Sequence, residues 1–585
     1  MMKKALILTV ALILMLAACK PQVVETPPSE TVDLSLPVEP SAAPEPTPTE
    51  TPPVTLTVCT ASLPETLSPF GGPLTPARER LNALLYPPAY TLGNVWLEPV
   101  PIRRGQMLVD ARGELVMAAE GVNVRPSGCR ENACSITWNG LDPLEMDRMV
   151  VDFSLHAGLT WSDGAPLIPA DAVLSYTLAS DPSSPVYGWA EARTESFNAR
   201  DAISLSWRGL PGFTSAELER FFWTPLPSHR FDSVPDFSAV AAETSSYGPF
   251  SLAERGEHEL LLTRNPGYPS PAETLPGVDQ VVLRALEGGA VAAWEALQTG
   301  TCDALDASFN LVEAPEVLAA IQSEPGYEVR VETDGPPTQL VFGIRPAEYD
   351  TINNPVFAER KDFFADSRTR LALTQCIDIE ALAAQTGSAP VLQAGLSYDP
   401  VAGATLLETV GWVDHDGDPL TPRVSQNVPG VFNSTPLSLT LLAGPSPFHQ
   451  DLAAGIAEML GICGVGLQVH TLSLPELYAP GPEGPLFGRA FDLTLLAWQR
   501  PPGGDCALYA SWAIPNTTNG WIGTNIAGFS DAGYDALCSA ALLATPEEVD
   551  TRRESAQAAF AELLPAVMLV TPVRVEVWKI DAGGW

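Results

Sequence analysis

Residues 151–173 have the sequence VDFSLHAGLTWSDGAPLIPADAV. Val151 to Leu155 alternate apolar and polar side chains, which predicts a half-buried β-strand. The run Ser162-Asp163-Gly164 predicts a turn, and Pro169 suits the first position of a helix because its φ angle is already helical. The residues expected to share one face of that helix are Val173, Leu174, Thr177 and Leu178. The segment therefore predicts a strand, a turn and a helix in succession.

The rest of the chain mixes the same two kinds of element and shows no short internal repeat. Ser367 to Leu382 predicts a helix with Cys376 and Ile379 on one side. Ser555 to Leu564 also predicts a helix, and Val573 to Val577 alternates as a strand does. This mixture predicts an α/β or α+β fold.

The N-terminus has the three parts of a secretion signal. Lys3 and Lys4 precede an apolar run of about a dozen residues, which is too short for the roughly 20 that a membrane-spanning helix needs. The run ends in Leu16-Ala17-Ala18-Cys19, which resembles the bacterial lipobox, so we expect residues 1–18 to be removed and Cys19 to be lipidated. An ordinary signal peptide followed by a chance cysteine is the alternative.

Residues 19–53 predict an extended tether. Pro, Thr, Glu, Ser and Val dominate them, and no apolar period is visible, so this segment cannot bury enough surface to offset the entropy of an ordered chain. A Pro-rich composition favours an extended, partly polyproline conformation. We expect the tether to hold the folded body, which begins near Val54, away from the membrane.

The length and charge of the folded part limit its class. Roughly 530 residues exceed one ordinary core, so at least two lobes are expected. The net charge of −38 argues against nucleic acid as a partner, because its phosphates would be repelled. The net charge is compatible with a cationic ligand but does not by itself indicate one. We expect a monomer.

The cysteines indicate an oxidising compartment. Setting Cys19 aside, eight remain, and an even number outside the cytoplasm predicts disulfides. The sequence alone favours only the pair Cys129 and Cys134, across a short turn. No cysteine or histidine spacing typical of zinc occurs, so we predict neither a metal site nor a cofactor.

Residues 151–173 resemble the signature of the extracellular family 5 solute-binding proteins, which are the oligopeptide-, dipeptide- and nickel-binding components of ABC importers. The resemblance covers the chain from about Val54 to its end. Further segments similar to this family occur in the same order: Leu56–Thr60, Tyr247–Phe250, Arg264–Tyr268, Leu297–Asp303, and Asp366–Leu373 with Ile377-Asp378. Each match is weak alone, and the shared order is what supports the resemblance.

The resemblance implies a periplasmic-binding-protein type 2 fold, a mixed α/β architecture of two lobes with an extra domain in the first. Domain I is expected to be assembled from residues 54–105, 243–335 and 556–585. Domain II is expected at 106–242, and the second lobe, domain III, at 336–555.

The resemblance also implies disulfides. Several members join the strands that correspond to Cys59 and Cys302. With that pair and Cys129–Cys134 assigned, four cysteines remain. Among these four we expect Cys376 to pair with Cys463, and Cys506 with Cys538. Other pairings of these last four cysteines stay open.

No sequence motif supports catalysis. The acidic run Asp414 to Asp418 has carboxylates spaced as in a calcium loop, but its glycine stands at the wrong position, and a solvated turn is favoured. No Gly-x-Ser-x-Gly elbow, phosphate-binding loop or dinucleotide fingerprint is present. We therefore predict that the protein is not an enzyme.

Candidate ligand contacts follow the predicted strand from Phe491 to Trp498. A Gly-rich loop then leads to Asp505, which would bring an aromatic face and a carboxylate to the mouth of a cleft. In peptide-binding members a loop carboxylate here pairs with the ligand's α-ammonium, and Asp505 is its counterpart. The loop departs from the family's usual Trp-x-Gly-Asp-x-x-x-Pro pattern, so a turn-capping role for Asp505 stays open.

Further candidates lie just beyond this loop. They are Tyr509, Trp512, Asn516 and Trp521. Aromatic and amide side chains can stack on peptides or sugars and hydrogen bond to them, although a plain core or loop role is equally open. Trp161, by contrast, is expected in the core.

The expected function is that of an extracytoplasmic lipoprotein that captures a ligand between two lobes and delivers it to the permease subunits of an ABC importer. Peptides are the leading ligand class, with sugars, opines and metal chelates behind. A lipoprotein that senses the same ligand for a membrane receptor is the first alternative, and an extracellular hydrolase is a more remote one.

Overall fold

The structure is a computed structural model that describes residues 52–70, 75–269, 277–344, 362–393, 395–418, 421–499, 501, 504–517, 519–521 and 523–580. The predicted signal peptide, Cys19 and tether residues 20–51 lie outside these residues. Within the described ranges, no helix is both long enough and apolar enough to cross a membrane.

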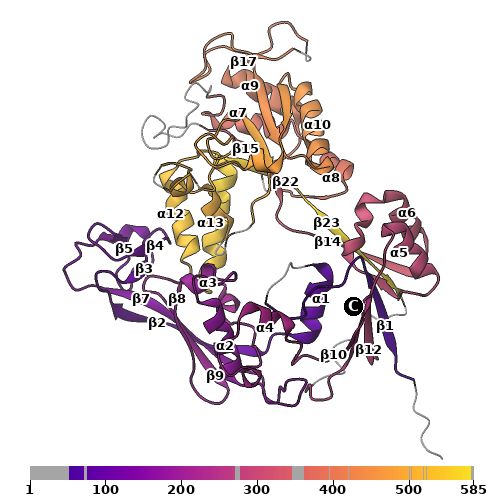
Figure 1. Ribbon diagram of the computed structural model, residues 1–585. Coiled ribbons are helices and arrows are strands. Elements are labelled where there is room, and N and C mark those ends of the chain that lie inside the picture. The colour runs from indigo at the N-terminus through magenta and orange to yellow at the C-terminus, as the bar shows by residue number, and fades with distance from the viewer. Residues whose placement is uncertain are drawn as a thin grey trace, which may run out of the picture. The chain divides into compact units, whose positions relative to one another are not determined.

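The first sheet has seven strands in the order β10-β11-β12-β1-β13-β23-β14. Their bounds are β1 Thr55–Thr60, β10 Phe250–Arg255, β11 Glu259–Arg264, β12 Gln280–Ala285, β13 Ala304–Leu305, β14 Tyr327–Thr333 and β23 Val573–Lys579. β1 runs parallel to β12 and β13, and the other neighbours are antiparallel. Indigo, magenta and yellow strands lie side by side here in Figure 1, so the beginning, middle and end of the chain build this sheet.

Helices from the middle of the chain pack on the first sheet. They are α5 Gly289–Gln298 and α6 Pro315–Ser323. Leu297 of α5 and Ile321 of α6 share a buried cluster with Val577 of β23. Cys59 and Cys302 lie in the same cluster and are joined by a disulfide.

The second sheet is antiparallel, with the strand order β2-β7-β9-β8. Its strands are β2 Tyr90–Pro101, β7 Glu145–Leu155, β8 Thr194–Ala199 and β9 Ser204–Gly209. The predicted strand at Val151 to Leu155 is confirmed as the end of β7, and the predicted helix is confirmed as α2 Pro169–Ala179.

Trp161, between that strand and that helix, is a core residue as expected. It is 1% exposed, and its Nε1 donates a hydrogen bond to Asp171 Oδ2 at 3.0 Å. Asp171 also accepts from the backbone N–H of Ile168 (3.0 Å) and of Ser228 (2.9 Å). The polar residues of the 151–173 segment therefore fix the start of α2, and their role is structural.

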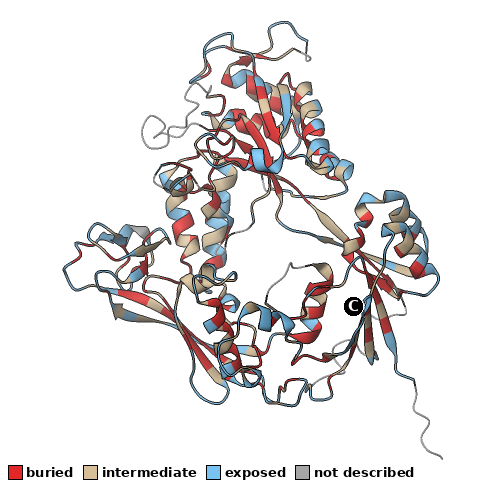
Figure 2. Ribbon diagram, viewed as in Figure 1, coloured by how far each residue is buried: buried red, intermediate tan, exposed pale blue. Residues whose placement is uncertain are grey.

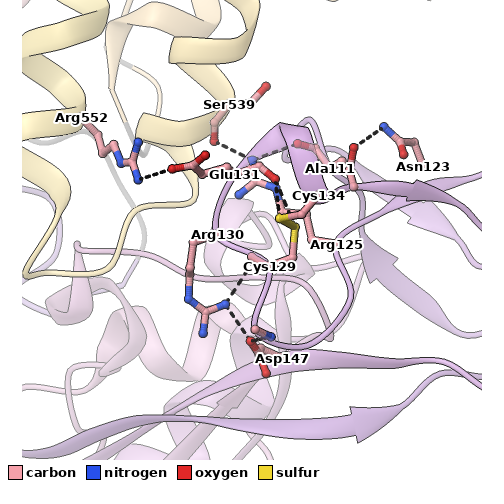
Figure 3. Close-up of a disulfide and its surroundings, with 12 residues drawn as sticks. Ala111, Asn123, Arg125, Cys129, Arg130, Glu131, Cys134, Asp147, Ser539 and Arg552 are labelled. Carbon is pink, nitrogen blue, oxygen red and sulfur yellow. Dashed lines mark hydrogen bonds and ion pairs between the residues drawn. A yellow bond between two sulfur atoms is a disulfide. The ribbon is translucent and has the colours of Figure 1, made fainter.

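Two small hairpins adjoin the second sheet. They are β3 Met107–Val109 with β4 Leu115–Met117, and β5 Asn123–Val124 with β6 Ile136–Thr137. The loop between β5 and β6 is closed by the disulfide Cys129–Cys134, which Figure 3 shows in its surroundings.

The third sheet has six strands in the order β16-β22-β15-β21-β19-β20. Its strands are β15 Thr338–Phe342, β16 Ala389–Pro390, β19 Ser438–Ala443, β20 Gly466–Thr471, β21 Leu493–Leu496 and β22 Ala566–Thr571. β19 is parallel to β20 and β21, and the other pairs are antiparallel. β15 and β21 are buried along their whole length, and the strands at the centre of this sheet are red in Figure 2.

Helices surround the third sheet. They are α7 Ser367–Gln375, α8 Ile379–Thr386, α9 Pro400–Val410, α10 Pro447–Ile462, α12 Ala532–Leu542 and α13 Val549–Leu563. The disulfide Cys376–Cys463 joins the end of α7 to the end of α10, and Cys506–Cys538 joins η6 Asp505–Tyr509 to α12. Cys129–Cys134 thus has the pairing that the sequence favours, and Cys59–Cys302 has the pairing that the resemblance implies. Cys376–Cys463 and Cys506–Cys538 are the pairs expected for the remaining four cysteines.

The remaining short elements connect these bodies. They are α1 Pro76–Leu85, α3 Trp189–Ala192, α4 Phe237–Ala242, α11 Leu474–Leu477, β17 Trp412–Val413, β18 Val424–Ser425, and the 3-10 turns η1 Asn132–Cys134, η2 Leu218–Phe221, η3 Ser228–Arg230, η4 Ala307–Phe309, η5 Leu311–Glu313 and η7 Ser511–Ala513.

The single helix expected from Ser367 to Leu382 is wrong, because the structure breaks it into α7 and α8. The Asp378 carboxylate accepts the backbone N–H of Ala381 at 2.9 Å and so caps a new helix start. The apolar period continues across this break, which is why the sequence pattern did not show it.

Strand pairing assigns two segments differently from the expected domain boundaries. β2 lies within 54–105, expected in domain I, but pairs with β7 in the second sheet. β22 lies within 556–585, also expected in domain I, but belongs to the third sheet. The boundary at 555/556 falls inside α13. The apolar sequence of a strand predicts that the strand is buried, but it does not predict the sheet to which the strand belongs.

The chain crosses between the first and third sheets twice in the described residues. One crossing runs from the end of β14 at Thr333 to the start of β15 at Thr338, and the other is Pro572 between β22 and β23. The backbone N–H of Asp334 donates to the Pro572 carbonyl at 2.7 Å, so the two crossings run beside each other.

Contacts also join the α12 and α13 region to the second sheet and its hairpins. Leu543, just after α12, lies in the same buried cluster as Trp207 of β9. Its carbonyl accepts a hydrogen bond from Thr214 Oγ1 at 2.5 Å. Figure 3 shows Arg125 donating to the Ser539 carbonyl at 3.4 Å.

The loop that carries Cys129 is organised by the Asp147 carboxylate. Asp147 accepts from Ser127 Oγ (2.6 Å), the Gly128 backbone N–H (2.9 Å) and Arg130 Nη1 (2.7 Å), the last of which is drawn in Figure 3. Burial by itself raises the pKa of Asp147, but these three donors outweigh it, and the net pKa lies below the ordinary aspartate value. The Asp147 carboxyl group therefore binds its proton less tightly in the folded protein than in the unfolded chain.

That difference predicts a pH dependence of stability. The contribution of Asp147 is fully present above the unfolded pKa of about 4 and is lost as the pH falls through the lower folded value. Between about pH 5 and pH 2, we expect the thermal unfolding temperature to fall more steeply in the wild type than in Asp147→Asn. Calorimetric scans across this range check the prediction, and parallel curves for the two proteins contradict it.

Candidate functional site

A cavity of about 780 Å³ lies beside α13. Its walls come from Leu392, Gln393 and Gly395, from η6, α12 and α13, and from Met568 of β22. This volume is within the roughly 300 to 1,000 Å³ typical of small-molecule sites. All of these walls belong to the body built on the third sheet and its helices.

The floor of the cavity is mainly apolar. Phe560 and Ala561 of α13, Met568 of β22 and Tyr509 of η6 contribute to it. Tyr509 and Phe560 also pack edge to face, with 5.1 Å between ring centroids. At the edge, Leu392 is 70% exposed. The space therefore offers apolar contacts to whatever enters it.

Asp505 opens η6 and presents an exposed carboxylate to the cavity. Its backbone is held from two sides. The next residue, Cys506, is bonded to Cys538 of α12, and the Cys506 carbonyl accepts a hydrogen bond from the Tyr534 hydroxyl at 3.0 Å. Asp505 thus stands on a rigid support, which is what a binding carboxylate needs for its position to be reproducible.

Two buried tyrosines line the cavity. The Tyr509 hydroxyl donates to Gln339 Oε1 of β15, and Tyr534 donates to the Cys506 carbonyl. Burial raises the pKa of both phenols, with a smaller contribution from the nearby Asp505 charge. Both hydroxyls therefore stay protonated and engaged with the protein, and they shape the cavity without serving as proton donors to a ligand.

The α13 wall is fixed at its C-terminal end by Arg370 of α7. Arg370 Nε donates to the Leu564 carbonyl at 2.9 Å, and Nη2 donates to the Leu563 carbonyl at 2.6 Å. Nη1 donates to the Phe364 carbonyl. Because the last carbonyls of a helix have no partners within it, this guanidinium caps α13. Burial lowers the pKa of Arg370 to about 10, so it keeps its charge at neutral pH.

Charged side chains of both signs line the cavity. Asp505 and Glu554 present exposed carboxylates, whereas the one arginine among the lining residues, Arg553, donates to Glu217 Oε1 at 2.9 Å. Glu217 lies outside the cavity, just before η2. The two exposed carboxylates can attract a ligand with a positive end.

Asp505 and Tyr509 are the predicted contact residues that line this cavity. Trp498, Trp512, Asn516 and Trp521 are not among the lining residues. Trp498 is half-buried, packs against the core of the third-sheet body and lies edge to face with Tyr478 at 6.4 Å between centroids. Trp512 packs against the same core.

Asn516 supports its own loop. It is buried, its Nδ2 donates to the Ile514 carbonyl at 3.0 Å, and its Oδ1 accepts the backbone N–H of Asn519 at 3.2 Å. Its carbonyl also accepts the backbone N–H of Trp521 at 2.9 Å. These bonds account for the amides seen in the sequence as local turn chemistry.

Sequence reasoning missed most of the residues that line the cavity. Arg553, Glu554 and Phe560 come from α13, and Leu392 and Met568 lie still farther along the chain from Asp505. The apolar residues among them belong to ordinary helix and strand patterns, which are typical of core positions. No local signal distinguishes a residue that lines an open cavity from one that fills a core.

The acidic run at Asp414 forms a closed turn. Asp414 Oδ1 accepts the Gly417 backbone N–H at 2.8 Å, and Asp416 Oδ1 accepts the Asp418 backbone N–H at 3.0 Å. Across the described part of the chain, no group of three or more His, Cys, Asp or Glu residues is arranged to hold a metal ion.

Sheets that exchange the chain through two adjacent crossings, together with a largely apolar cavity that carries a carboxylate, are typical of a two-lobed binding protein of the periplasmic type. The chain belongs to the bacterial extracellular solute-binding proteins, family 5, whose middle region matches residues 144–520. This match confirms the predicted family and, with it, a solute-binding role instead of an enzymatic one.

Solved structures confirm the predicted fold. An ABC transporter substrate-binding protein from Sinorhizobium meliloti is 16% identical, with a TM-score of 0.61 over 90% of this chain and 95% of that chain. MppA, a periplasmic murein tripeptide binding protein in its unliganded open form, is 18% identical, with a TM-score of 0.60 over 91% and 94%. NikA from Brucella suis, in complex with Fe(III)-EDTA, is 15% identical, with a TM-score of 0.56 over 91% and 96%. No curated protein sequence matches the chain.

Proposed function

We propose that this protein is the solute-binding component of an ABC importer and that it captures a peptide, with Asp505 binding the peptide's α-ammonium group. The observation that carries the proposal is the position of Asp505, on a disulfide-linked turn at the edge of the 780 Å³ cavity. The similarity in fold to a murein tripeptide binding protein and to an ABC transporter substrate-binding protein supports this class of ligand and partner.

An ammonium group suits this position for electrostatic reasons. A charge-assisted hydrogen bond from an ammonium to a carboxylate is stronger than a bond between neutral groups, and it strengthens when water is excluded. Asp505 and Glu554 would both attract the cation, and the bond from Arg553 to Glu217 offsets part of the arginine charge.

Capture is proposed to involve closure of two lobes around the peptide. The adjacent crossings at Asp334 and Pro572 are the natural hinge, because few residues there need to change their backbone angles. The first lobe would comprise domains I and II, and the second would comprise domain III extended by β22. A ligand that contacts both lobes shifts the population toward the closed form.

The cellular setting is part of the same proposal. Cys19 would carry the lipid anchor, residues 20–53 would form the tether, and the monomeric body would act outside the cytoplasm beside the permease subunits. Mass spectrometry of molecules that co-purify with the native protein identifies the ligand class directly. A sugar, opine or metal chelate in place of a peptide would replace the ligand assignment and leave the family unchanged.

Replacing Asp505 with asparagine is expected to raise the Kd for a tripeptide with a free N-terminus by at least about tenfold, equivalent to about 1.4 kcal/mol. The substitution keeps the size of the side chain and removes its charge. Isothermal titration calorimetry of the two proteins measures the effect.

The control is Glu562→Gln, which removes the same charge from an exposed position of α13 outside the cavity. This variant is expected to bind the tripeptide as the wild type does. Unchanged affinity in Asp505→Asn would remove Asp505 from the binding site.

A further inference from the structure

We infer that the cavity beside α13 selects peptides whose first residue has a large apolar side chain. This inference rests on the proposed function and names the ligand class more narrowly. The juxtaposition that carries it is a carboxylate, Asp505, next to an apolar floor formed by Phe560, Ala561 and Met568.

The α-ammonium group determines which side chain of the peptide reaches the cavity. When the α-ammonium group binds Asp505, the side chain of the same residue starts only two bonds away from the nitrogen. It must therefore enter the space next to Asp505, which is the cavity. The first residue of the peptide, and no later one, is the residue whose side chain this space accepts.

The lining of this space favours an apolar side chain. Phe560, Ala561 and Met568 line the space with carbon and sulfur, and Leu392 at its edge is 70% exposed. Apolar surface gains free energy when it is removed from water, and an apolar side chain in the cavity removes it on both partners. A Phe, Leu, Met or Trp side chain fits this description.

The same lining disfavours polar first residues. An acidic side chain placed against Phe560, Ala561 and Met568 would lose its water without gaining apolar contact. A small polar side chain would leave the apolar floor uncovered or would lose its own hydrogen bonds to water. Selection therefore combines a gain from apolar contact with a cost of removing polar groups from water.

The size of the cavity agrees with this selection. At about 780 Å³ it exceeds what a peptide backbone terminus alone would fill. Tyr509 and Tyr534 also line it, and their hydroxyls are bound to Gln339 and to the Cys506 carbonyl. These two residues therefore offer their rings to a ligand in place of their hydroxyl groups.

The test measures the Kd values of three tripeptides for the full-length protein by isothermal titration calorimetry. Phe-Ala-Ala is expected to bind at least about tenfold more tightly than Ser-Ala-Ala. Ala-Ala-Phe, which has the same composition as Phe-Ala-Ala, is expected to lack this advantage because its aromatic side chain is at the other end.

A variant that fills the cavity makes the test specific. Ala561→Trp is expected to reduce the Phe-Ala-Ala to Ser-Ala-Ala affinity ratio to near one, whereas Ser555→Trp, on the exposed face of the same helix outside the cavity, is expected to leave the ratio unchanged. If Ala561→Trp unfolds at a lower temperature than the wild type, Ala561→Leu fills the cavity less drastically and is expected to lower the ratio partially.

The outcomes separate the inference from the proposed function. Equal binding of Phe-Ala-Ala, Ser-Ala-Ala and Ala-Ala-Phe would overturn the inference and leave peptide capture intact. Absence of binding by all three would overturn the proposed function itself. Binding of phenethylamine as tightly as Phe-Ala-Ala would show that the cavity takes an apolar amine without reading a peptide, which also overturns the inference.

Discussion

Replacing Cys59 and Cys302 together with alanine is expected to lower the free energy of unfolding by about 5 kcal/mol, because their disulfide closes a long loop. The two residues are 243 positions apart, both are fully buried, and they lie in the cluster that joins the first sheet to α5. Cutting the bond gives the unfolded chain the freedom that this loop had removed. The first sheet, which gathers strands from three parts of the chain, loses the covalent link between β1 and the segment that leads into β13.

The matched control is the pair Cys129 and Cys134, which are 5 positions apart. The same loop-entropy relation gives only about 2 kcal/mol for their replacement with alanine. Urea unfolding followed by tryptophan fluorescence measures both double variants. Equal losses in the two would show that loop length does not determine what these disulfides contribute.

Replacing Arg370 with methionine is expected to lower the free energy of unfolding by about 3 kcal/mol or more, since it leaves three carbonyl oxygens without their charged donor. Those carbonyls are on Leu564, Leu563 and Phe364. Arg370 is 4% exposed, so water cannot take over all of its bonds. Methionine keeps most of the side chain's length, and the loss therefore reports on the hydrogen bonds more than on packing.

Arg368, two residues earlier in the same helix, is the control for this prediction. Its side chain is 52% exposed and pairs with Asp366 at the surface, where an ion pair contributes roughly 0 to 1 kcal/mol. Arg368→Met is therefore expected to unfold close to the wild-type urea midpoint. A comparable destabilisation by both substitutions would mean that the capping of α13 by Arg370 is not the source of the effect.

These two arginines also show what a sequence motif contains. The segment from Asp366 to Leu373 supported the family resemblance, yet nothing in its letters distinguishes the exposed arginine from the buried one. The structure shows that Arg370 holds the end of α13, and α13 forms one wall of the candidate site. A segment that supported the family resemblance therefore also stabilises the helix that forms one wall of the cavity.

Much of the fold was accessible from the sequence because local patterns report local structure. The alternation at Val151 to Leu155 and the Pro169 helix start were confirmed in β7 and α2. The predicted helix near the C-terminus and the strand at Val573 correspond to α13 and β23. The prediction of a single helix from Ser367 to Leu382 failed at Asp378. The Asp378 side chain caps the start of a second helix there, although the apolar period continues across the break.

The candidate site was accessible only in part. Asp505 could be singled out because it follows a predicted strand and a Gly-rich loop, and it does line the cavity. Trp498, Trp512, Asn516 and Trp521 were grouped with it because they are near in sequence and chemically versatile. Nearness in sequence did not bring them to the cavity, and the residues that share it with Asp505 come from α13, β22 and the segment at Leu392.

The sequence by itself determined the family, the mixture of helices and strands, and the expectation of export. Each of these depends on residue types that lie close together along the chain. The tertiary structure alone decided which strands share a sheet, as β22 and β23 show by entering different sheets on either side of Pro572. It alone also placed Phe560 and Met568 in the same cavity as Asp505. The physical reason is that burial fixes how apolar a residue must be, whereas the partner that buries it is selected by packing over the whole chain.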